Sequence, residues 1–239
     1  MNLVIIPTYN EQENIADILI HVMRLEGQFH VLVIDDASPD GTAGIVKSLQ
    51  LCYPDRIHLL ERSGKLGLGT AYLTGFKWAL ENGYDFIFEM DADFSHNPDD
   101  LIRLWKACSE EGADLSVGSR YCSGISVVDW PIGRIIMSYG ASLYVRAILN
   151  MKVFDTTAGF VCYSRKVLET LDLDAVKMKG YGFQIEMKYS AWKLGFKLKE
   201  VPIVFTNRQK GTSKMSSGIF GEAFWGVMGL RFRKITAKA

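Results

Sequence analysis

Long apolar segments are the first thing that this sequence of 239 residues lacks. A helix that spans a bilayer needs about 20 consecutive apolar residues. The nearest candidate, residues 218–232, is shorter and contains Glu222 and Arg231. The N-terminal residues also lack the basic segment and the apolar stretch of a secretory signal. We therefore expect no spanning helix and no signal peptide.

Cysteine is also scarce, and charge is balanced. The four cysteines are widely separated and form no C-x-x-C pair, which argues against a zinc cluster and against a disulfide framework. They are best interpreted as free thiols in a reducing compartment. The formal net charge is +0, so we expect no nucleic-acid partner, although basic residues become denser near the C-terminus.

The two common phosphate-binding motifs are absent as well. No G-x-G-x-x-G follows the first predicted strand, which argues against a dinucleotide-dependent dehydrogenase, and no G-x-x-x-x-G-K-[ST] segment indicates a P-loop. A glycine-rich segment, residues 65–71, follows the third predicted strand instead. Its backbone amides could approach an anion, or the segment could form a tight turn before a helix.

Apolar runs alternate with amphipathic helical patterns in the N-terminal part of the chain. Strands are predicted at residues 3–6, 31–34, 57–60 and 86–90. Three helices are predicted between them: one at 15–25, one that follows residue 42, and one that ends at residue 80. The later pattern is mixed, with helices predicted at 101–108 and 133–149 and strands at 114–118, 161–163 and 201–206. This order predicts a single α/β domain with a mostly parallel central sheet flanked by helices.

Three of the predicted strands end in polar residues: residues 7–11 follow the first, Asp35 and Asp36 the second, and Asp91 and Asp93 the fourth. In a parallel sheet these ends lie on one edge, where ligands bind in open α/β proteins. Two carboxylates in a D-x-D pattern suit a hard cation such as Mg²⁺ or Mn²⁺ that also holds substrate phosphates. A solvated, aspartate-capped turn explains one such end, but three together favour a site.

Taken together, the motifs resemble those of inverting GT-A glycosyltransferases of family 2. The segments that carry the resemblance are residues 7–11 (PTYNE), 35–42 (DDASPDGT), 65–71 (KLGLGTA) and 91–93 (DAD). Later segments are similar to those of the polyprenol (dolichol) phosphate mannosyltransferases, namely residues 118–121, 130–134, 155–160, 182–186 and 208–214. The resemblance covers about residues 2–215 and implies a GT-A, Rossmann-like fold.

The resemblance implies roles for individual residues. It implies a nucleotide-sugar site formed by Pro7, Tyr9, Glu11, Asp35, Asp36, Lys65, Gly69, Asp91, Ala92, Asp93, Gln184, Glu186, Arg208 and Lys214. Within this set it makes Asp91 and Asp93 the ligands of Mg²⁺ or Mn²⁺, and it adds Arg208 and Lys214 to the catalytic group. It also implies an acceptor-phosphate site formed by Arg120, Arg134 and Ser138. Surface ion pairs are the alternative for the two arginines, and Ser95 stands where family members often have glutamine.

The resemblance further implies an inverting transfer of mannose from GDP-mannose to a polyprenyl phosphate. The alternative is transfer of glucose or another hexose from a UDP-sugar to this lipid or to a saccharide. A catalytically inactive nucleotide-sugar-binding subunit is a further alternative, against which the intact Asp91 and Asp93 argue. A phosphate monoester has a second pKa of about 6 and is largely ionised at pH 7. The acceptor is therefore expected to need little or no general base.

A lipid acceptor requires contact with a membrane surface. Residues 132–149 and 219–230 give two apolar helical faces, the second followed by basic residues, a pattern typical of peripheral helices. Packing onto the core or onto a partner subunit is the alternative. We expect residues 1–206 to form the catalytic domain, and residues 207–239 to form a basic loop that closes over the donor and an interfacial helix.

The expected location is the cytoplasm or the cytoplasmic side of a membrane, as a peripheral protein with or without a small membrane subunit. His96 lies just after the D-x-D pair but is isolated in the sequence, and we expect its side chain to be exposed to solvent.

Overall fold

Strands and helices alternate along most of the chain in this computed structural model, which describes residues 1–178, 180–208, 210 and 219–238, with the backbone alone for 219–223. The strands are β1 (Asn2–Thr8), β2 (Phe29–Asp35), β3 (Ile57–Glu61), β4 (Phe86–Glu89), β5 (Leu115–Ser119), β6 (Val127–Val128), β7 (Val161–Ser164), β8 (Leu198–Pro202) and β9 (Phe205–Thr206). The helices are α1 (Ile15–Arg24), α2 (Thr42–Cys52), α3 (Leu68–Glu81), α4 (Asp100–Ser109), α5 (Ile132–Leu149), α6 (Arg165–Thr170), α7 (Gly180–Lys193) and α8 (Ile219–Phe232), with a 3₁₀ turn, η1, at Leu173–Ala175.

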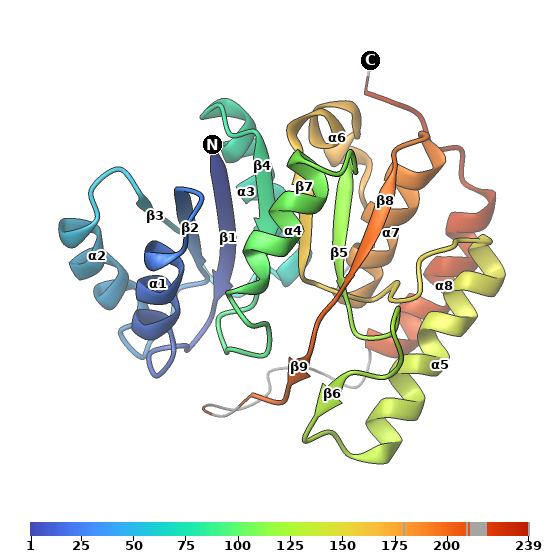
Figure 1. Ribbon diagram of the computed structural model, residues 1–239, viewed down its shortest axis with the longest axis horizontal. Coiled ribbons are helices and arrows are strands. Elements are labelled where there is room, and N and C mark those ends of the chain that lie inside the picture. The colour runs from blue at the N-terminus through green and yellow to red at the C-terminus, as the bar shows by residue number, and fades with distance from the viewer. Residues whose placement is uncertain (179, 209, 211–218, 239) are drawn as a thin grey trace.

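Seven strands form the central sheet, in the order β3-β2-β1-β4-β7-β5-β8 (Figure 1). Strand β7 pairs antiparallel with both of its neighbours, whereas the other described pairings in this sheet are parallel. Residue Thr8 of β1 lies opposite Asp35 of β2, so these two strands end at the same edge. The mostly parallel α/β sheet predicted from the sequence is confirmed.

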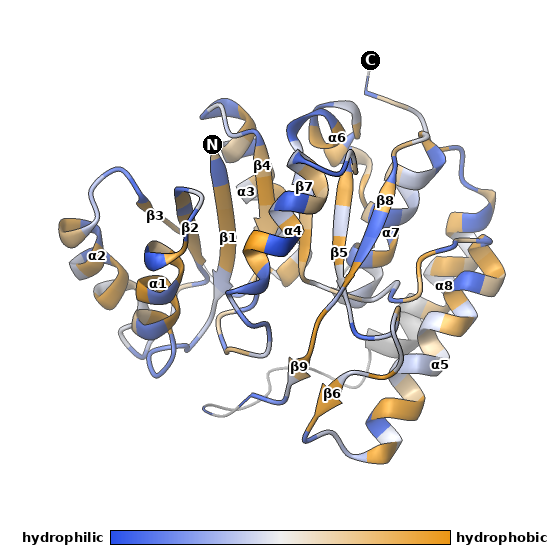
Figure 2. Cartoon of the chain, in the orientation of Figure 1, coloured by the Kyte–Doolittle hydropathy of each residue, from blue (hydrophilic) through white to orange (hydrophobic). Residues whose placement is uncertain are grey.

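Helices cover both faces of the sheet, and the alternation of side chains along β1 serves both layers. Val4 and Ile6 pack with α1, α2 and α4, while Leu3 and Ile5 pack with α3, α6 and α7. Figure 2 shows the corresponding apolar strands in the middle of the domain. A third apolar cluster joins α5 and α8 to α7 at one side of the domain, so α8 is anchored beside the sheet rather than on it (Figure 1).

The single strand predicted at 201–206 is wrong in detail. Strand β8 ends at Pro202, which has no backbone N–H to donate to a further partner. The chain then leaves the large sheet, and the amide of Phe205 donates to the carbonyl of Ser126 at 3.0 Å. Residues 205–206 thereby form β9, which pairs with β6 in a separate two-stranded sheet. This small sheet lies beyond the edge where β1 ends (Figure 1).

Throughout the described ranges, every helix falls short of the length and apolar character that crossing a membrane requires.

Candidate active site

The carboxyl ends of β1 and β2 are joined by hydrogen bonds centred on Asp35. Its carboxylate accepts from the Thr8 hydroxyl at 2.8 Å, and from the amide and the hydroxyl of Ser38 at 2.9 and 2.5 Å. The Asp35 side chain is buried, and these bonds occupy it. The structure therefore places this predicted nucleotide-binding residue beneath the loops, where it fixes their shape.

Asp36, the next residue, is held by an arginine that sequence reasoning missed. The Arg62 guanidinium donates to both Asp36 carboxylate oxygens, at 2.5 and 2.8 Å, and also to the Thr70 hydroxyl at 2.8 Å. Two parallel bonds of this kind fix geometry as well as charge. Arg62 directly follows β3, so its position at a strand end was the signal that could have found it.

Two more predicted nucleotide residues lie at this edge. The Lys65 ammonium lies 5.2 Å from the centre of the Tyr9 ring, within the range of a cation–π contact. Gly69 has a packing role instead, because a Cβ at this position would lie 3.0 Å from the Phe183 ring of α7. Pro7 and Ala92 complete the set, in β1 and between the two aspartates.

Three segments far apart in the sequence meet at Asp93. One Asp93 carboxylate oxygen accepts the Ser95 amide at 3.0 Å, and the other pairs with the Arg208 guanidinium at 2.6 Å. Arg208 also lies 3.6 Å from the Glu11 carboxylate. Burial alone raises the pKa of Asp93, but the Ser95 amide and the Arg208 charge outweigh it and hold the pKa below its usual value. Asp93 is therefore an anion that already attracts a cation.

Asp91 lies beside this group in a different electrostatic state. Its recessed position and the nearby charge of Asp93 raise its pKa to about 7, even though water still reaches 41% of its side chain. Two carboxylates that repel one another in this way provide hard oxygen ligands for Mg²⁺ or Mn²⁺. Within the described ranges no third His, Cys, Asp or Glu joins them as a metal-binding group. The donor set therefore fits a cation that substrate phosphates help to hold.

The expected exposure of His96 is wrong, since only 3% of this residue is exposed. Its ring stacks on Phe160 at 4.8 Å and meets the edge of Phe205 at 5.3 Å. Its Nδ1 accepts the backbone N–H of Asp91 at 3.3 Å, and burial lowers its pKa to about 4. Phe205 of β9 and Phe160, the residue before β7, cover this side chain, and sequence spacing alone did not reveal these contacts. His96 thus supports the D-x-D loop as a neutral ring.

The predicted acceptor residues lie together, but they are not equivalent. Arg120 is buried and donates to both oxygens of Asp155, at 2.7 and 2.6 Å. Arg134 is exposed, lies 3.9 Å from the centre of the Trp130 ring and donates to Asn207 at 3.0 Å. The Ser138 hydroxyl accepts from Tyr121 at 2.7 Å. Arg134 is therefore the more accessible cation, and Arg120 is largely committed to Asp155.

Gln184 and Glu186 lie on α7 and point to different partners. Gln184 donates to the buried Glu89 carboxylate of β4, and the Lys188 ammonium lies 3.4 Å from its side-chain oxygen. Glu186 is buried and accepts bonds from the loop before α7 and from Arg233. The structure does not bring Glu186 into the group around Asp93, and Lys214 lies outside the described residues.

Comparisons with known proteins place this geometry among sugar transferases. Residues 3–172 match the family described as Glycosyl transferase family 2. The chain is 49% identical over 232 residues to polyprenol monophosphomannose synthase of Mycolicibacterium smegmatis, covering 95% of this chain and 87% of that protein. It is 45% identical over 240 residues to undecaprenyl-phosphate mannosyltransferase of Micrococcus luteus, covering 97% of this chain and 98% of that protein.

Solved structures match at lower identity. Glucosyl-3-phosphoglycerate synthase from Mycobacterium tuberculosis in complex with Mn²⁺, UDP and phosphoglyceric acid gives a TM-score of 0.73 at 16% identity, covering 97% of this chain and 78% of that chain. The complex of the same protein with UDP gives a TM-score of 0.71 at 15% identity, covering 97% of this chain and 80% of that chain. At these identities the likeness establishes the fold.

Proposed function

Because this chain belongs to glycosyl transferase family 2, we propose that it transfers mannose from GDP-mannose to a polyprenyl phosphate, with inversion at the sugar carbon. The observation that carries the proposal is the meeting of Asp93, Arg208 and Glu11 at the carboxyl edge of the sheet. The choice of sugar and lipid is supported by two relatives named for polyprenol monophosphomannose and for undecaprenyl-phosphate mannosyl transfer.

The residues at the edge suit the departure of a nucleoside diphosphate. A divalent ion held by Asp91 and Asp93 would supply Lewis-acid neutralisation of the leaving phosphates. Arg208, which pairs with Asp93 in this structure, would then donate to the diphosphate as negative charge develops on it. Tyr9, Lys65 and Asp36 would bound the nucleotide, with Asp36 held in place by Arg62.

The acceptor side needs a cation rather than a base. A phosphate monoester is largely ionised at pH 7, because its second pKa is about 6. Arg134 is the exposed guanidinium beside Trp130, and its planar fork matches two phosphate oxygens. Arg120 would act behind it, since its bonds to Asp155 fix the aromatic wall of Trp130 and Phe205. We assign no general base.

A donor panel tests this proposal. The purified chain would be incubated with a short polyprenyl phosphate and with GDP-mannose, UDP-glucose or GDP-glucose, and lipid-linked sugar would be measured. We expect product with GDP-mannose, loss of product with EDTA, and recovery with Mn²⁺ or Mg²⁺ but not Ca²⁺. Product with UDP-glucose and none with GDP-mannose would reject GDP-mannose as the donor and assign UDP-glucose instead. Full activity in EDTA would remove the metal from the proposal.

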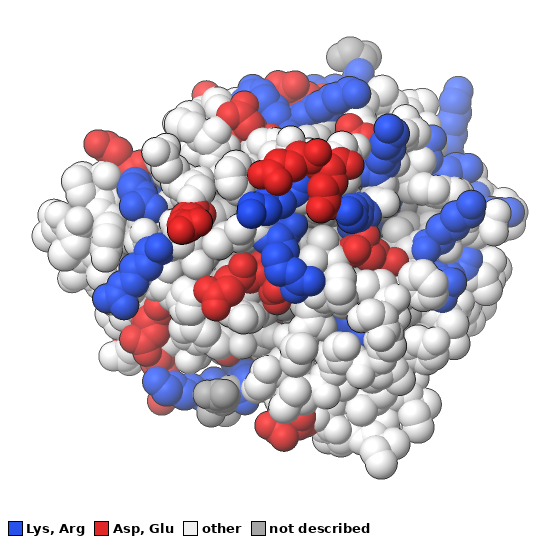
Figure 3. Space-filling view, viewed as in Figure 1, with Lys and Arg blue, Asp and Glu red and all other residues white. Residues whose placement is uncertain are grey.

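The lipid acceptor also calls for a surface that meets a membrane, and we propose that α5 and α8 provide it. Ile136 of α5 is 66% exposed and Trp225 of α8 is 73% exposed. The lower half of α5 is apolar in Figure 2, and the surface over it carries almost no charge in Figure 3. Arg231 and Lys234 follow at the end of α8, a combination that suits anionic lipid. In this arrangement residues 207–239 serve both substrates, with Arg208 at the donor and α8 at the lipid, while residues 211–218 of the predicted closing loop lie outside the described residues.

We expect the double variant Ile136→Ser/Trp225→Ser to bind anionic vesicles more weakly than the wild type. Each substitution should weaken binding by about tenfold, since burying a large apolar side chain contributes about 1.5–3 kcal/mol. Vesicle co-sedimentation measures this. Leu51→Ser is the matched control, because Leu51 is 86% exposed but lies on α2, at the far side of the domain (Figure 1). Equal binding by the wild type, the double variant and the control would point to a protein partner on this face instead.

A further inference from the structure

Met178, in the loop before α7, is wedged between two helices. A Cβ added at Gly182 of α7 would lie 2.7 Å from the Met178 methyl group, and one at Gly226 of α8 would lie 2.5 Å from it. Real Cβ atoms do not approach other atoms so closely, so both helices leave the space that this side chain fills. By contrast, a Cβ at Gly229 on the same helix would meet nothing within 4 Å.

A buried carboxylate fastens the same loop to the end of α8. Glu186 accepts the backbone amides of Lys177 at 3.1 Å and Met178 at 2.7 Å. Its other partner is the guanidinium of Arg233, the residue that follows α8. Hydrogen bonds to an ionised group are about twice as strong as neutral ones, so one side chain ties the loop and the helix end together.

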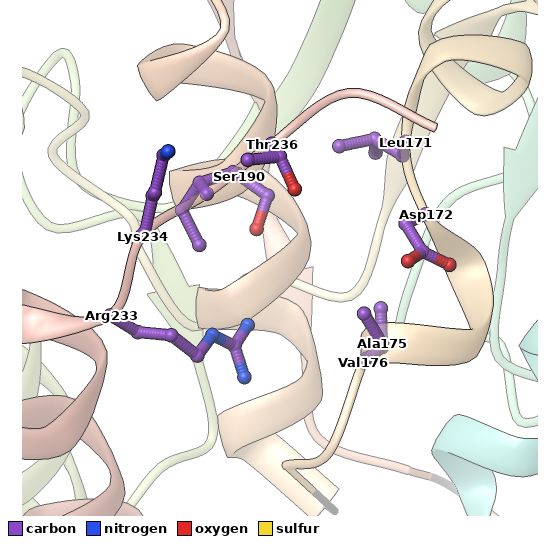
Figure 4. A pocket seen from close by; sticks show the side chains of 9 residues that line it. Leu171, Asp172, Ala175, Val176, Ser190, Arg233, Lys234 and Thr236 are labelled. Carbon is purple, nitrogen blue, oxygen red and sulfur yellow. The ribbon is translucent and has the colours of Figure 1, made fainter. Parts of the chain in front are cut away.

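The segment after α8 leaves space beside this contact. A cavity of about 50 Å³ lies between α7, η1 and this segment. Figure 4 shows Arg233 extending from the segment toward Ala175 and Val176, which lie on the opposite side of the cavity. The contact between Glu186 and Arg233 therefore sits at a place with room for a small shift rather than in a solid core.

Tyr181 lies in the first turn of α7, next to Gly182, against which Met178 packs. Burial raises the pKa of Tyr181, and the groups whose charges act on its hydroxyl are Arg120, Arg134, Asp91 and Tyr121. The Tyr181 hydroxyl is thus near both of the proposed acceptor arginines and near Asp91. A displacement of Met178 would reach Tyr181 through Gly182, the next residue on α7.

We propose that Glu186, Arg233 and Met178 are positioning residues that couple α8 to Tyr181, so that the seating of α8 on a lipid surface sets the alignment of the acceptor with the donor. This rests on the proposed function, and it gives Glu186 a role different from donor binding.

The matched pair Gly226→Ala and Gly229→Ala tests the wedge, because the two variants make the same chemical change on one helix. With the acceptor in anionic vesicles, we expect Gly226→Ala to lower kcat/KM for the acceptor by about fivefold, at the low end of couplings between sites, because the methyl end of Met178 can shift at modest cost. Gly229→Ala should match the wild type, and the dissociation constant of the nucleotide donor, measured by calorimetry, should stay unchanged in both. Equal kinetics for the two variants would overturn the proposal.

Hydrogen exchange gives a second readout that does not need an active enzyme. We expect Arg233→Gln to speed exchange of the Lys177 and Met178 amides, with Arg233→Lys intermediate, and vesicles to alter exchange of these amides in the wild type but not in Arg233→Gln. Unchanged exchange in Arg233→Gln, or no effect of vesicles on the wild type, would also overturn the coupling. A wild type without transfer activity on any donor would instead reject the proposed function and leave this exchange test readable.

Discussion

Asp93→Asn is expected to lower the rate of sugar transfer by about a thousandfold or more. The amide keeps the shape and can still accept the Ser95 amide, but it loses the charge that attracts Arg208 and a divalent ion. A bound metal contributes several kcal/mol of charge stabilisation, and each 1.4 kcal/mol corresponds to about a factor of ten. Initial rates at saturating donor, together with Mn²⁺ titration by calorimetry, measure both losses.

The control for this variant lies in the same loop. Asp99 is exposed and pairs with His21, so Asp99→Asn should retain wild-type transfer. Because Asp93→Asn also gives up the ion pair with Arg208, the melting temperature should be measured beside the rate, and a variant that stays folded at the assay temperature separates lost chemistry from lost folding. A rate within about tenfold of the wild type would mean that Asp93 does not serve the reaction and would revive an inactive nucleotide-sugar-binding subunit as the better account.

Asp155→Ala is expected to lower the free energy of unfolding by about 3–5 kcal/mol, the usual cost of leaving one member of a buried ion pair alone. Asp155 is fully buried and accepts two side-chain bonds from Arg120 and one from its backbone amide, at 2.9 Å. Urea titration measures the change. Glu169→Ala, which breaks an exposed pair with Arg165, should change stability by no more than about 0.5 kcal/mol.

A further variant separates the structural role of Arg120 from a role in binding the acceptor. Arg120→Met/Asp155→Leu removes both charges, and such exchanges are often neutral for stability. We expect this pair to recover most of the stability lost in Asp155→Ala. Normal transfer by the double variant would assign the acceptor phosphate to Arg134 alone, whereas a stable but inactive double variant would place Arg120 in acceptor binding.

The strands that end at the site were predictable because burial on both sides gives a continuous apolar run, and turn residues mark its end. Asp35, Asp36, Asp91 and Asp93 were found in this way at one edge of the sheet. The partners that hold Asp36, Arg120 and Glu186 in place were not predictable. Arg62, Asp155 and Arg233 each act through a contact with a residue distant in sequence, and a single sequence contains no record of such pairings.

The direction in which a side chain points was the second property that the sequence could not predict. Glu186 lies in a segment that resembles a donor-binding motif, but it is placed on a helix, so its direction depends on how α7 packs. It points toward Lys177, Met178 and Arg233. His96 was misjudged for the same reason, since its burial comes from Phe160 and Phe205, which reach it from other elements.

The small sheet of β6 and β9 connects the proposed acceptor side of the site with the proposed donor side. Strand β6 leads into Trp130 and α5, on the acceptor side, while β9 leads to Arg208, on the donor side, and the two strands pair with each other. Under the proposed function, a lipid phosphate bound by Arg134 would act on the segment that carries Arg208, because Arg134 donates to Asn207, the preceding residue. By the reciprocity of linked equilibria, each substrate changes the affinity for the other by the same factor. We therefore expect the affinities for donor and acceptor to be linked through this pairing rather than independent.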